Sequence, residues 1–365
     1  MSNPPDGHIW EEEPRGGYPD PGMLALPGRE RLTQWNRGAA PAPPLSRLTG
    51  AIYTGFGDGT ANADMPASGW LLNSAGVIGG GTLAIVADVA FGCAIETKLP
   101  PATPYTTAEL SLSFLRPAHA GHTLSAGGQA IHVGRSVALS EVFLLEDDGD
   151  RLIAHGTSRC AVLPPIDPPP EPSAEPATVT PDPETESDPY RRPWPRDAIL
   201  QQEVWDRFSG REVLERQLRG ELPAPPIHRL TGIRPVGITD GEATVILPAT
   251  KWLTSPATTI QGGVIAMLAD TAMTVAVQTT VPAGTAVAGL DLKVNYLRPA
   301  LPDGRDLTAR GSIVHAGRKL VVTRAEVDNA DGKRVALATG TSMYLPECPA
   351  ALGEVELAAD ADAAQ

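Results

Sequence analysis

The sequence contains one long segment twice, with matching residue numbers that differ by 182. Residues 80–88 (Gly-Gly-Thr-Leu-Ala-Ile-Val-Ala-Asp) correspond to residues 262–270 (Gly-Gly-Val-Ile-Ala-Met-Leu-Ala-Asp). Other pairs at the same spacing are Arg47-Leu-Thr-Gly50 with Arg229-Leu-Thr-Gly232, Trp70-Leu71 with Trp252-Leu253, and Phe114-Leu-Arg-Pro117 with Tyr296-Leu-Arg-Pro299. This period is longer than the roughly 20–50 residues of solenoid repeats. The sequence therefore predicts two similar domains, each long enough to bury its own core.

A charged residue lies inside the most apolar part of each repeat. Residues 80–95 are apolar on every face, a pattern typical of a helix that is buried all round. Asp88 stands in the middle of this segment, where an unpaired carboxylate would be destabilising by several kcal/mol. A neighbouring arginine or backbone group that satisfies Asp88 is one interpretation. The recurrence of the same residue as Asp270 favours a functional role.

The acidic residues of the chain gather outside the repeats. Residues 1–20, 164–190 and 347–365 together hold 17 acidic residues and one arginine. Their combined net charge of −16 is larger in magnitude than the formal net charge of the whole chain, −14. The repeats themselves are therefore close to neutral. This distribution is typical of solvated tails and linkers and gives no indication of a nucleic-acid partner.

Cysteine usage and the N-terminal sequence exclude several other classes. Cys93, Cys160 and Cys348 are odd in number and lack the spacing of a zinc site, so we expect neither a disulfide framework nor a metal. The N-terminus has no basic and apolar signal-peptide pattern, and no apolar run reaches membrane length. We interpret the chain as a cytoplasmic protein without a membrane partner.

Strands are predicted on both sides of the buried helix. Alternating or β-rich segments at 106–115, 122–133, 136–145 and 152–163 follow the helix, and a hairpin between residues 45 and 67 precedes it. This order indicates an α+β fold in which an antiparallel sheet curls around a central helix. The predicted organisation is a disordered segment 1–25, domain one at 26–163, an acidic Pro-rich linker at 164–195, domain two with an N-terminal helix at 196–346, and an acidic tail at 347–365.

The combination of these motifs resembles a known family. Asn73, the glycines 80 and 81, and Asp88, followed by Phe114-Leu-Arg-Pro117 and a Gly-Arg turn, are similar to the hotdog-fold acyl-CoA thioesterases of the PaaI-like type. The resemblance covers about residues 45–164 and 227–346 and implies a tandem double hotdog. It also implies hydrolysis of an acyl-CoA to the free acid and CoA, without a cofactor.

The resemblance assigns a role to each matched position in the first repeat. It implies that Asn73 orients water or the thioester, that the Gly80 N–H binds the thioester oxygen, and that Asp88 is the general base or nucleophile. Thr107 matches a hydroxyl that the family often places in the strand after the helix.

The second repeat matches these positions with Ser255, Gly262 and Asp270. Gly289 replaces the hydroxyl residue. Gly79 and Gln261 stand where the family usually has histidine.

Helix geometry predicts that each site combines both repeats. Eight residues of helix place Asp88 about 12 Å from the N-terminus of its own helix, too far to act there. Two such helices packed antiparallel would bring each N-terminus beside the aspartate of the other, as in a fused homodimer. We therefore define site one by Asn73, Gly80 and Asp270. Site two is defined by Ser255, Gly262, Asp88 and Thr107.

Glycine N–H groups at a positive helix end suit a developing oxyanion, so Gly81 and Gly263 are expected to help bind the substrate. Because site one keeps the asparagine, we expect it to carry most of the hydrolysis.

Several alternatives stay open at this stage. Arg135 and Arg318 follow glycine at matching turns, and either bind the substrate near its pantetheine arm or are solvated turn residues. A non-catalytic acyl-CoA sensor and a hotdog hydratase or dehydratase are the alternative functions. Assembly beyond the intramolecular pseudo-dimer into a further homo-oligomer is also open.

Overall fold

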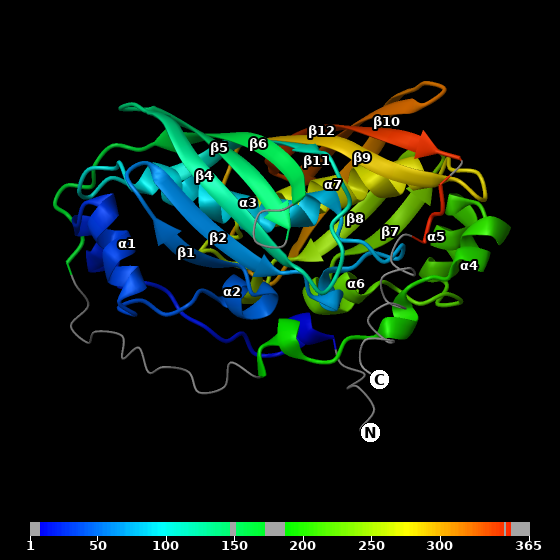
Figure 1. Ribbon diagram of the computed structural model, residues 1–365, viewed down its shortest axis with the longest axis horizontal. Coiled ribbons are helices and arrows are strands. Elements are labelled where there is room, and N and C mark those ends of the chain that lie inside the picture. The colour runs from blue at the N-terminus through cyan, green and yellow to red at the C-terminus, as the bar shows by residue number, and fades with distance from the viewer. Residues whose placement is uncertain (1–7, 147–150, 172–186, 347, 352–365) are drawn as a thin grey trace.

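The computed structural model describes residues 8–146, 151–171, 187–346 and 348–351. Its centre consists of two helices, α3 (Gly80–Glu96) and α7 (Gly262–Gln278), which pack against each other. Figure 1 shows a broad sheet arching over both helices, with shorter helices beneath them and at both sides of the molecule. The expected fold, two tandem hotdog domains with a sheet wrapped around each central helix, is confirmed.

The described residues form one antiparallel 12-stranded sheet in the order β1-β2-β4-β5-β6-β3-β9-β12-β11-β10-β8-β7. The strands of the first repeat are β1 (Ile52–Phe56), β2 (Thr60–Pro66), β3 (Tyr105–Phe114), β4 (Thr123–Val133), β5 (Val137–Glu146) and β6 (Arg151–Val162). Those of the second are β7 (Arg234–Thr239), β8 (Glu242–Pro248), β9 (Ala286–Tyr296), β10 (Asp306–Ala316), β11 (Leu320–Asp328) and β12 (Arg334–Leu345).

The two halves of the sheet join between β3 and β9. Their register pairs Glu109 with Asn295 and Ser113 with Asp291, and at the centre Ser111 pairs with Lys293. Ser111 and Lys293 are equivalent positions of the two repeats, because their numbers differ by 182. The pseudo-two-fold axis therefore passes between them, as in a side-by-side dimer fused into one chain.

Both central helices are buried as their apolar pattern predicts. Every residue of α3 from Gly81 to Ala87 is buried, and α7 is buried in the same way from Gly263 to Ala269. Each helix begins after a residue that gives no side-chain cap, Gly79 in α3 and Gln261 in α7. The free N–H groups of the first turn therefore need other partners.

Short helices cover the edges of the two cores. These are α1 (Gly28–Asn36), α2 (Pro44–Thr49), α4 (Gln202–Arg207), α5 (Gly210–Leu218) and α6 (Pro226–Thr231). Helices α1 and α5 occupy equivalent places in the two repeats, since their first residues, Gly28 and Gly210, differ by 182. The segment after Leu45 begins in helix α2 rather than in a strand. Pro44 is pre-organised for a first helical turn, and Gly50 ends the helix in the left-handed conformation.

The segment preceding each repeat crosses to the other repeat. Residues 8–25 were expected to be disordered, but the indole N–H of Trp252 donates to the Glu12 carbonyl at 3.0 Å and Ile9 is buried. In the matching place on repeat one, the indole of Trp70 donates to the Arg192 carbonyl at 2.9 Å. The Pro-rich composition concealed this order, since the partners of each segment belong to the distant repeat.

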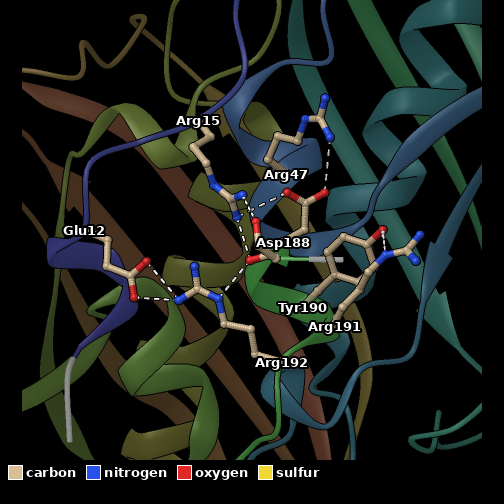
Figure 2. Close-up of polar contacts among 8 residues, drawn as sticks. Glu12, Arg15, Arg47, Asp188, Tyr190, Arg191 and Arg192 are labelled. Atoms are coloured by element: carbon tan, nitrogen blue, oxygen red, sulfur yellow. Dashed lines mark hydrogen bonds and ion pairs between the residues drawn. The ribbon is translucent and has the colours of Figure 1, made fainter. Parts of the chain in front are cut away.

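The end of the linker is fixed by a buried carboxylate. Figure 2 shows Asp188 between Arg15 and Arg47, each 3.3 Å from one carboxylate oxygen, while Arg192 binds Glu12 at 2.7 Å. The last part of the expected linker, residues 187–195, is therefore held in place by these ion pairs. Residues 1–7, 172–186, 347 and 352–365 of the expected disordered segment, linker and acidic tail lie outside the described residues.

No helix in the described part of the chain combines the length and apolar character needed to cross a membrane.

Candidate active sites at the paired helix ends

Each central helix presents its first turn to the aspartate of the other helix. The Gly81 N–H donates to Oδ2 of Asp270 at 2.8 Å, and the Gly263 N–H donates to Oδ2 of Asp88 at 3.3 Å. The structure thus brings Asp270 to Gly81 and Asp88 to Gly263, as the antiparallel helix packing predicts. Each carboxylate supplies the helix cap that the chain lacks locally.

Glycine allows the two helices to approach this closely. A Cβ on Gly81 would lie 2.5 Å from the Cβ of Asp270, and one on Gly263 would collide with the Ala84 carbonyl. Since real Cβ atoms essentially never come so near, no larger residue fits without moving a helix. The second glycine of each pair is therefore required by the helix packing, whatever else its N–H group does.

Burial changes the proton affinity of both aspartates. It raises the pKa of Asp88 to about 6, although hydrogen bonds from Thr107 and from the Gly263 and Gly262 N–H groups act in the opposite direction. Burial likewise raises the pKa of Asp270 to about 6, opposed only by the Gly81 N–H. A carboxylate with a pKa near 6 is ionised at neutral pH and is a stronger base than an ordinary aspartate.

Site two holds its carboxylate from two directions. Thr107 Oγ1 donates to Oδ1 of Asp88 at 3.1 Å, while Gly263 binds the other oxygen. The register of β3 with β6 shifts between Thr107 and Glu109, which is the sign of a bulge. Bulges re-aim side chains next to functional sites. The equivalent bulge of β9 follows Gly289, which has no side chain to offer Asp270.

One aromatic position differs between the two sites. The hydroxyl of Tyr296 in site two donates to the Gly262 carbonyl at 2.8 Å. Its counterpart in site one, Phe114, has no hydroxyl, and a Cβ on Gly80 would lie 2.6 Å from its ring. In site two the nearest group to such a Cβ on Gly262 is the Asp88 carboxylate, at 3.1 Å. The ring of Phe114 therefore occupies space at Gly80 that the carboxylate occupies at Gly262.

Asn73 and Ser255 bind the backbone of their own loops. Oδ1 of Asn73 accepts the N–H groups of Ala75 at 2.9 Å and Val77 at 3.3 Å. Oγ of Ser255 accepts the N–H of Ala257 at 3.3 Å. Both side chains thus shape the loop that leads into the helix. The side-chain amide oxygen of Asn73 therefore already accepts two hydrogen bonds.

Gln261 is a further polar residue at site two. Its Nε2 donates to the Ile85 carbonyl of the opposite helix at 3.0 Å, while its Oε1 is buried without a hydrogen-bond partner among the described residues. Gly79 occupies the matching place in site one. The sequence signal for Gln261 was its departure from the family's histidine, but its contact with the opposite helix could not be inferred.

The remaining expected binding residues lie in exposed turns of the sheet. Arg135 and Arg318 are exposed, in the β4–β5 and β10–β11 turns respectively. Within the described residues, no three His, Cys, Asp or Glu side chains gather closely enough to hold a metal ion. Sequence reasoning missed Tyr296 and Phe114. The only available signal was the Phe-to-Tyr exchange between two otherwise matching strand ends.

Comparison with known proteins agrees with the duplication. The family model of the thioesterase superfamily matches residues 75–153 and again 258–336. A protein named as a putative esterase from Halobacterium salinarum is 35% identical over 121 residues, which are 30% of this chain and 78% of that protein. The medium/long-chain acyl-CoA thioesterase YigI of Salmonella typhimurium is 44% identical over 54 residues, 15% of this chain and 34% of the relative.

A solved structure extends the similarity to both repeats. The tesB protein of Mycobacterium avium subspecies paratuberculosis superposes with a TM-score of 0.50 at 15% identity, covering 83% of this chain and 98% of that one. At this identity the match concerns the double-hotdog fold alone. The family match in each repeat and the Halobacterium relative show the family: the chain belongs to the thioesterase superfamily.

Proposed function

We propose that the protein hydrolyses acyl-CoA thioesters to a free acid and CoA. The observation that carries this proposal is the Asp88 carboxylate, which is held by Thr107 at 3.1 Å and faces the first turn of α7. This arrangement places a base next to backbone N–H donors at a positive helix end. The name of the Salmonella relative, an acyl-CoA thioesterase, supports the same substrate class.

The proposed reaction uses the aspartate as a general base. A water molecule attacks the thioester carbonyl carbon, its proton passes to the carboxylate, and the carbonyl oxygen becomes an oxyanion near the Gly262 N–H. The carbon–sulfur bond then breaks, and the leaving CoA sulfur takes the proton from the aspartic acid. The products are a carboxylic acid and CoA, and the carboxylate is restored. In site one Asp270 and Gly80 take the corresponding roles.

A covalent route uses the same residues. The aspartate attacks the thioester carbonyl, CoA leaves as thiolate, and water hydrolyses the resulting mixed anhydride. Single turnover in ¹⁸O-water tests for the covalent route, which is identified by label in the protein. General-base catalysis puts the label in the released acid during the first turnover. Attack by the aspartate, followed by water addition at its own carbonyl, leaves the label in the protein.

Thiol release from a panel of thioesters tests the function. We expect hydrolysis of at least one of butanoyl-, decanoyl-, palmitoyl- and phenylacetyl-CoA by the full chain. The double variant Asp88→Asn/Asp270→Asn should lose at least about 100-fold in rate, since a positioned general base typically contributes about 10²–10⁴-fold. Tight binding of a thioester with no thiol release would instead indicate a sensor.

A further inference from the structure

The peptide group between Gly262 and Gly263 is held at both ends in site two. Its carbonyl oxygen accepts the Tyr296 hydroxyl at 2.8 Å, and its N–H donates to Asp88 Oδ2 at 3.3 Å. A hydrogen bond to a peptide carbonyl polarises the N–H of the same group and strengthens the bond that this N–H donates. Tyr296 is therefore connected to the Asp88 carboxylate through one peptide unit.

Site one lacks this connection. The Gly81 N–H reaches Asp270, but Phe114 at the tyrosine position has no hydroxyl to bind the Gly80 carbonyl. Gly289 also removes the hydroxyl that Thr107 provides in site two. A Cβ at Gly289 would lie 3.7 Å from the Phe114 ring, so that ring lines the region that a hydroxyl side chain there would enter.

We infer that Tyr296 is a positioning residue that acts on Asp88 through the Gly262–Gly263 peptide, and that site two, which it completes, carries the hydrolysis. This inference rests on the proposed thioesterase function. It reverses the order expected from the sequence, which favoured site one because of Asn73. The side-chain amide oxygen of Asn73 accepts two loop N–H groups, whereas the hydroxyl of Thr107 donates to the Asp88 carboxylate itself.

The other titratable groups that face Asp88 do not ionise in the pH range where it does. They are Tyr296 from β9, Cys160 from β6 and Cys93 from α3 itself. Burial raises the pKa of the Cys160 thiol to about 12 and raises the pKa values of Cys93 and Tyr296 well above their usual range. A change in the acid limb of the pH profile therefore reports on the carboxylate.

The first experiment measures which of the two aspartates, Asp88 or Asp270, supports most of the hydrolysis. Decanoyl-CoA, or whichever of the four thioesters is hydrolysed fastest, is assayed with the full chain carrying Asp88→Asn or Asp270→Asn. We expect Asp88→Asn to lower kcat by at least about 100-fold, and by at least about 30 times more than Asp270→Asn lowers it. The opposite pattern overturns the inference but leaves the thioesterase function in place. A wild-type chain that hydrolyses none of the thioesters would contradict both the inference and the proposed thioesterase function.

The second experiment tests Tyr296 in the Asp270→Asn chain, where only site two can act. Tyr296→Phe copies the residue of site one and weakens the Gly263 N–H bond to the carboxylate. The pKa of Asp88 should then rise, and the acid limb of kcat should move to higher pH by about half a unit. A shift of this size lowers kcat about twofold at pH near 6 and about threefold further down the acid limb, with KM unchanged.

Tyr344→Phe is the matched control. The Tyr344 hydroxyl shares a hydrogen bond of 2.8 Å with Thr280, just beyond the far end of α7. Both substitutions remove one tyrosine hydrogen bond near the same helix, but only Tyr296→Phe should move the pH profile. A profile that Tyr296→Phe leaves in place, or that Tyr344→Phe moves equally, contradicts the positioning role.

A converse variant keeps the inference testable if Tyr296→Phe fails to fold. In the Asp88→Asn chain, Phe114→Tyr with Gly289→Thr rebuilds the two missing hydroxyls around Asp270. We expect thiol release at site one to rise at least about fivefold over Asp88→Asn alone. A folded variant, verified by circular dichroism, that shows no gain would overturn the explanation of the asymmetry.

Discussion

The N–H of Gly81 binds Oδ2 of Asp270 at 2.8 Å across the interface between the two repeats. This bond, with its counterpart from Gly263 to Asp88, means that neither repeat contains a whole site. The duplication has therefore converted a symmetric pair of sites into two sites that can change independently. Thr107 and Tyr296 on one side, and Gly289 and Phe114 on the other, are such changes.

The shared sites predict that an isolated repeat is inactive. A fragment of residues 8–171 or 187–351 would hold one helix N-terminus and one aspartate, about 12 Å apart along the same helix. We expect no thiol release from either fragment unless it self-associates, because only a second helix brings the two groups together. Analytical ultracentrifugation with parallel assays tests this. A monomeric fragment with activity would disprove the shared-site arrangement.

The close helix approach predicts a large penalty for a single methyl group. Gly263→Ala places a Cβ against the Ala84 carbonyl and the Ile85 Cα, both of which are backbone atoms that cannot move aside. Overpacking of this kind typically costs about 1–3 kcal/mol of unfolding free energy. Gly55→Ala is the matched control, since a Cβ there meets nothing within 4 Å. Urea denaturation should separate the two variants, and equal midpoints would show that the helices can shift freely.

The crossed segments predict a link between Asp188 and the N-terminal residues. The Asp188 side chain is 4% exposed and lies between Arg15 and Arg47. Asp188→Asn leaves two arginines beside a neutral group, and breaking a buried pair typically costs about 3–5 kcal/mol. We expect lower stability and faster proteolysis at residues 8–20. Asp331→Asn, which removes an exposed partner of Arg305, is the control. Equal proteolysis of both variants would contradict the anchoring role.

Sequence reasoning reached the parts of the fold that depend on local pattern. The buried helix with its central aspartate follows from apolar residues on every face, and the pairing of Asp270 with the first repeat follows from the length of eight helical residues. Sequence reasoning did not predict contacts that depend on the relative orientation of segments far apart in the chain. The hydroxyl of Tyr296 binds Gly262, 34 residues earlier, and Glu12 binds Trp252 through its backbone carbonyl, 240 residues away. No periodicity encodes either contact.

The same limitation explains why the sequence pattern favoured site one. Asn73 matches the family pattern, but its role depends on where its amide points, and Oδ1 turns to the loop N–H groups of Ala75 and Val77. Thr107 was assigned to site two from its position. The bulge that follows it in β3, which aims such a side chain, is a feature of the sheet register and is invisible in the strand pattern.

The raised pKa of Asp88 predicts that removing its charge stabilises the protein at neutral pH. Burial raises the pKa from an ordinary value of 3.8 to about 6, so the folded state binds the proton more tightly than the unfolded state does. The charged carboxylate therefore lowers stability above about pH 6, and this unfavourable contribution disappears below about pH 4. A shift of about two units corresponds to about 1–3 kcal/mol after allowing for relaxation of the site. We expect Asp88→Asn to unfold at a higher urea concentration than the wild type at pH 8, and at nearly the same concentration at pH 4.

Glu212→Gln serves as the control of opposite sign. Hydrogen bonds from the Ser209 backbone and hydroxyl lower the pKa of this exposed glutamate, so its charge stabilises the fold above its usual pKa. Its removal should therefore lower stability slightly at pH 8, where the removal of Asp88 raises it. Urea denaturation of both variants at the two pH values measures the difference. If Asp88→Asn destabilises the chain at pH 8 as Glu212→Gln does, the carboxylate of Asp88 is stabilised rather than strained by its site, and the protein has not sacrificed stability to keep a base there.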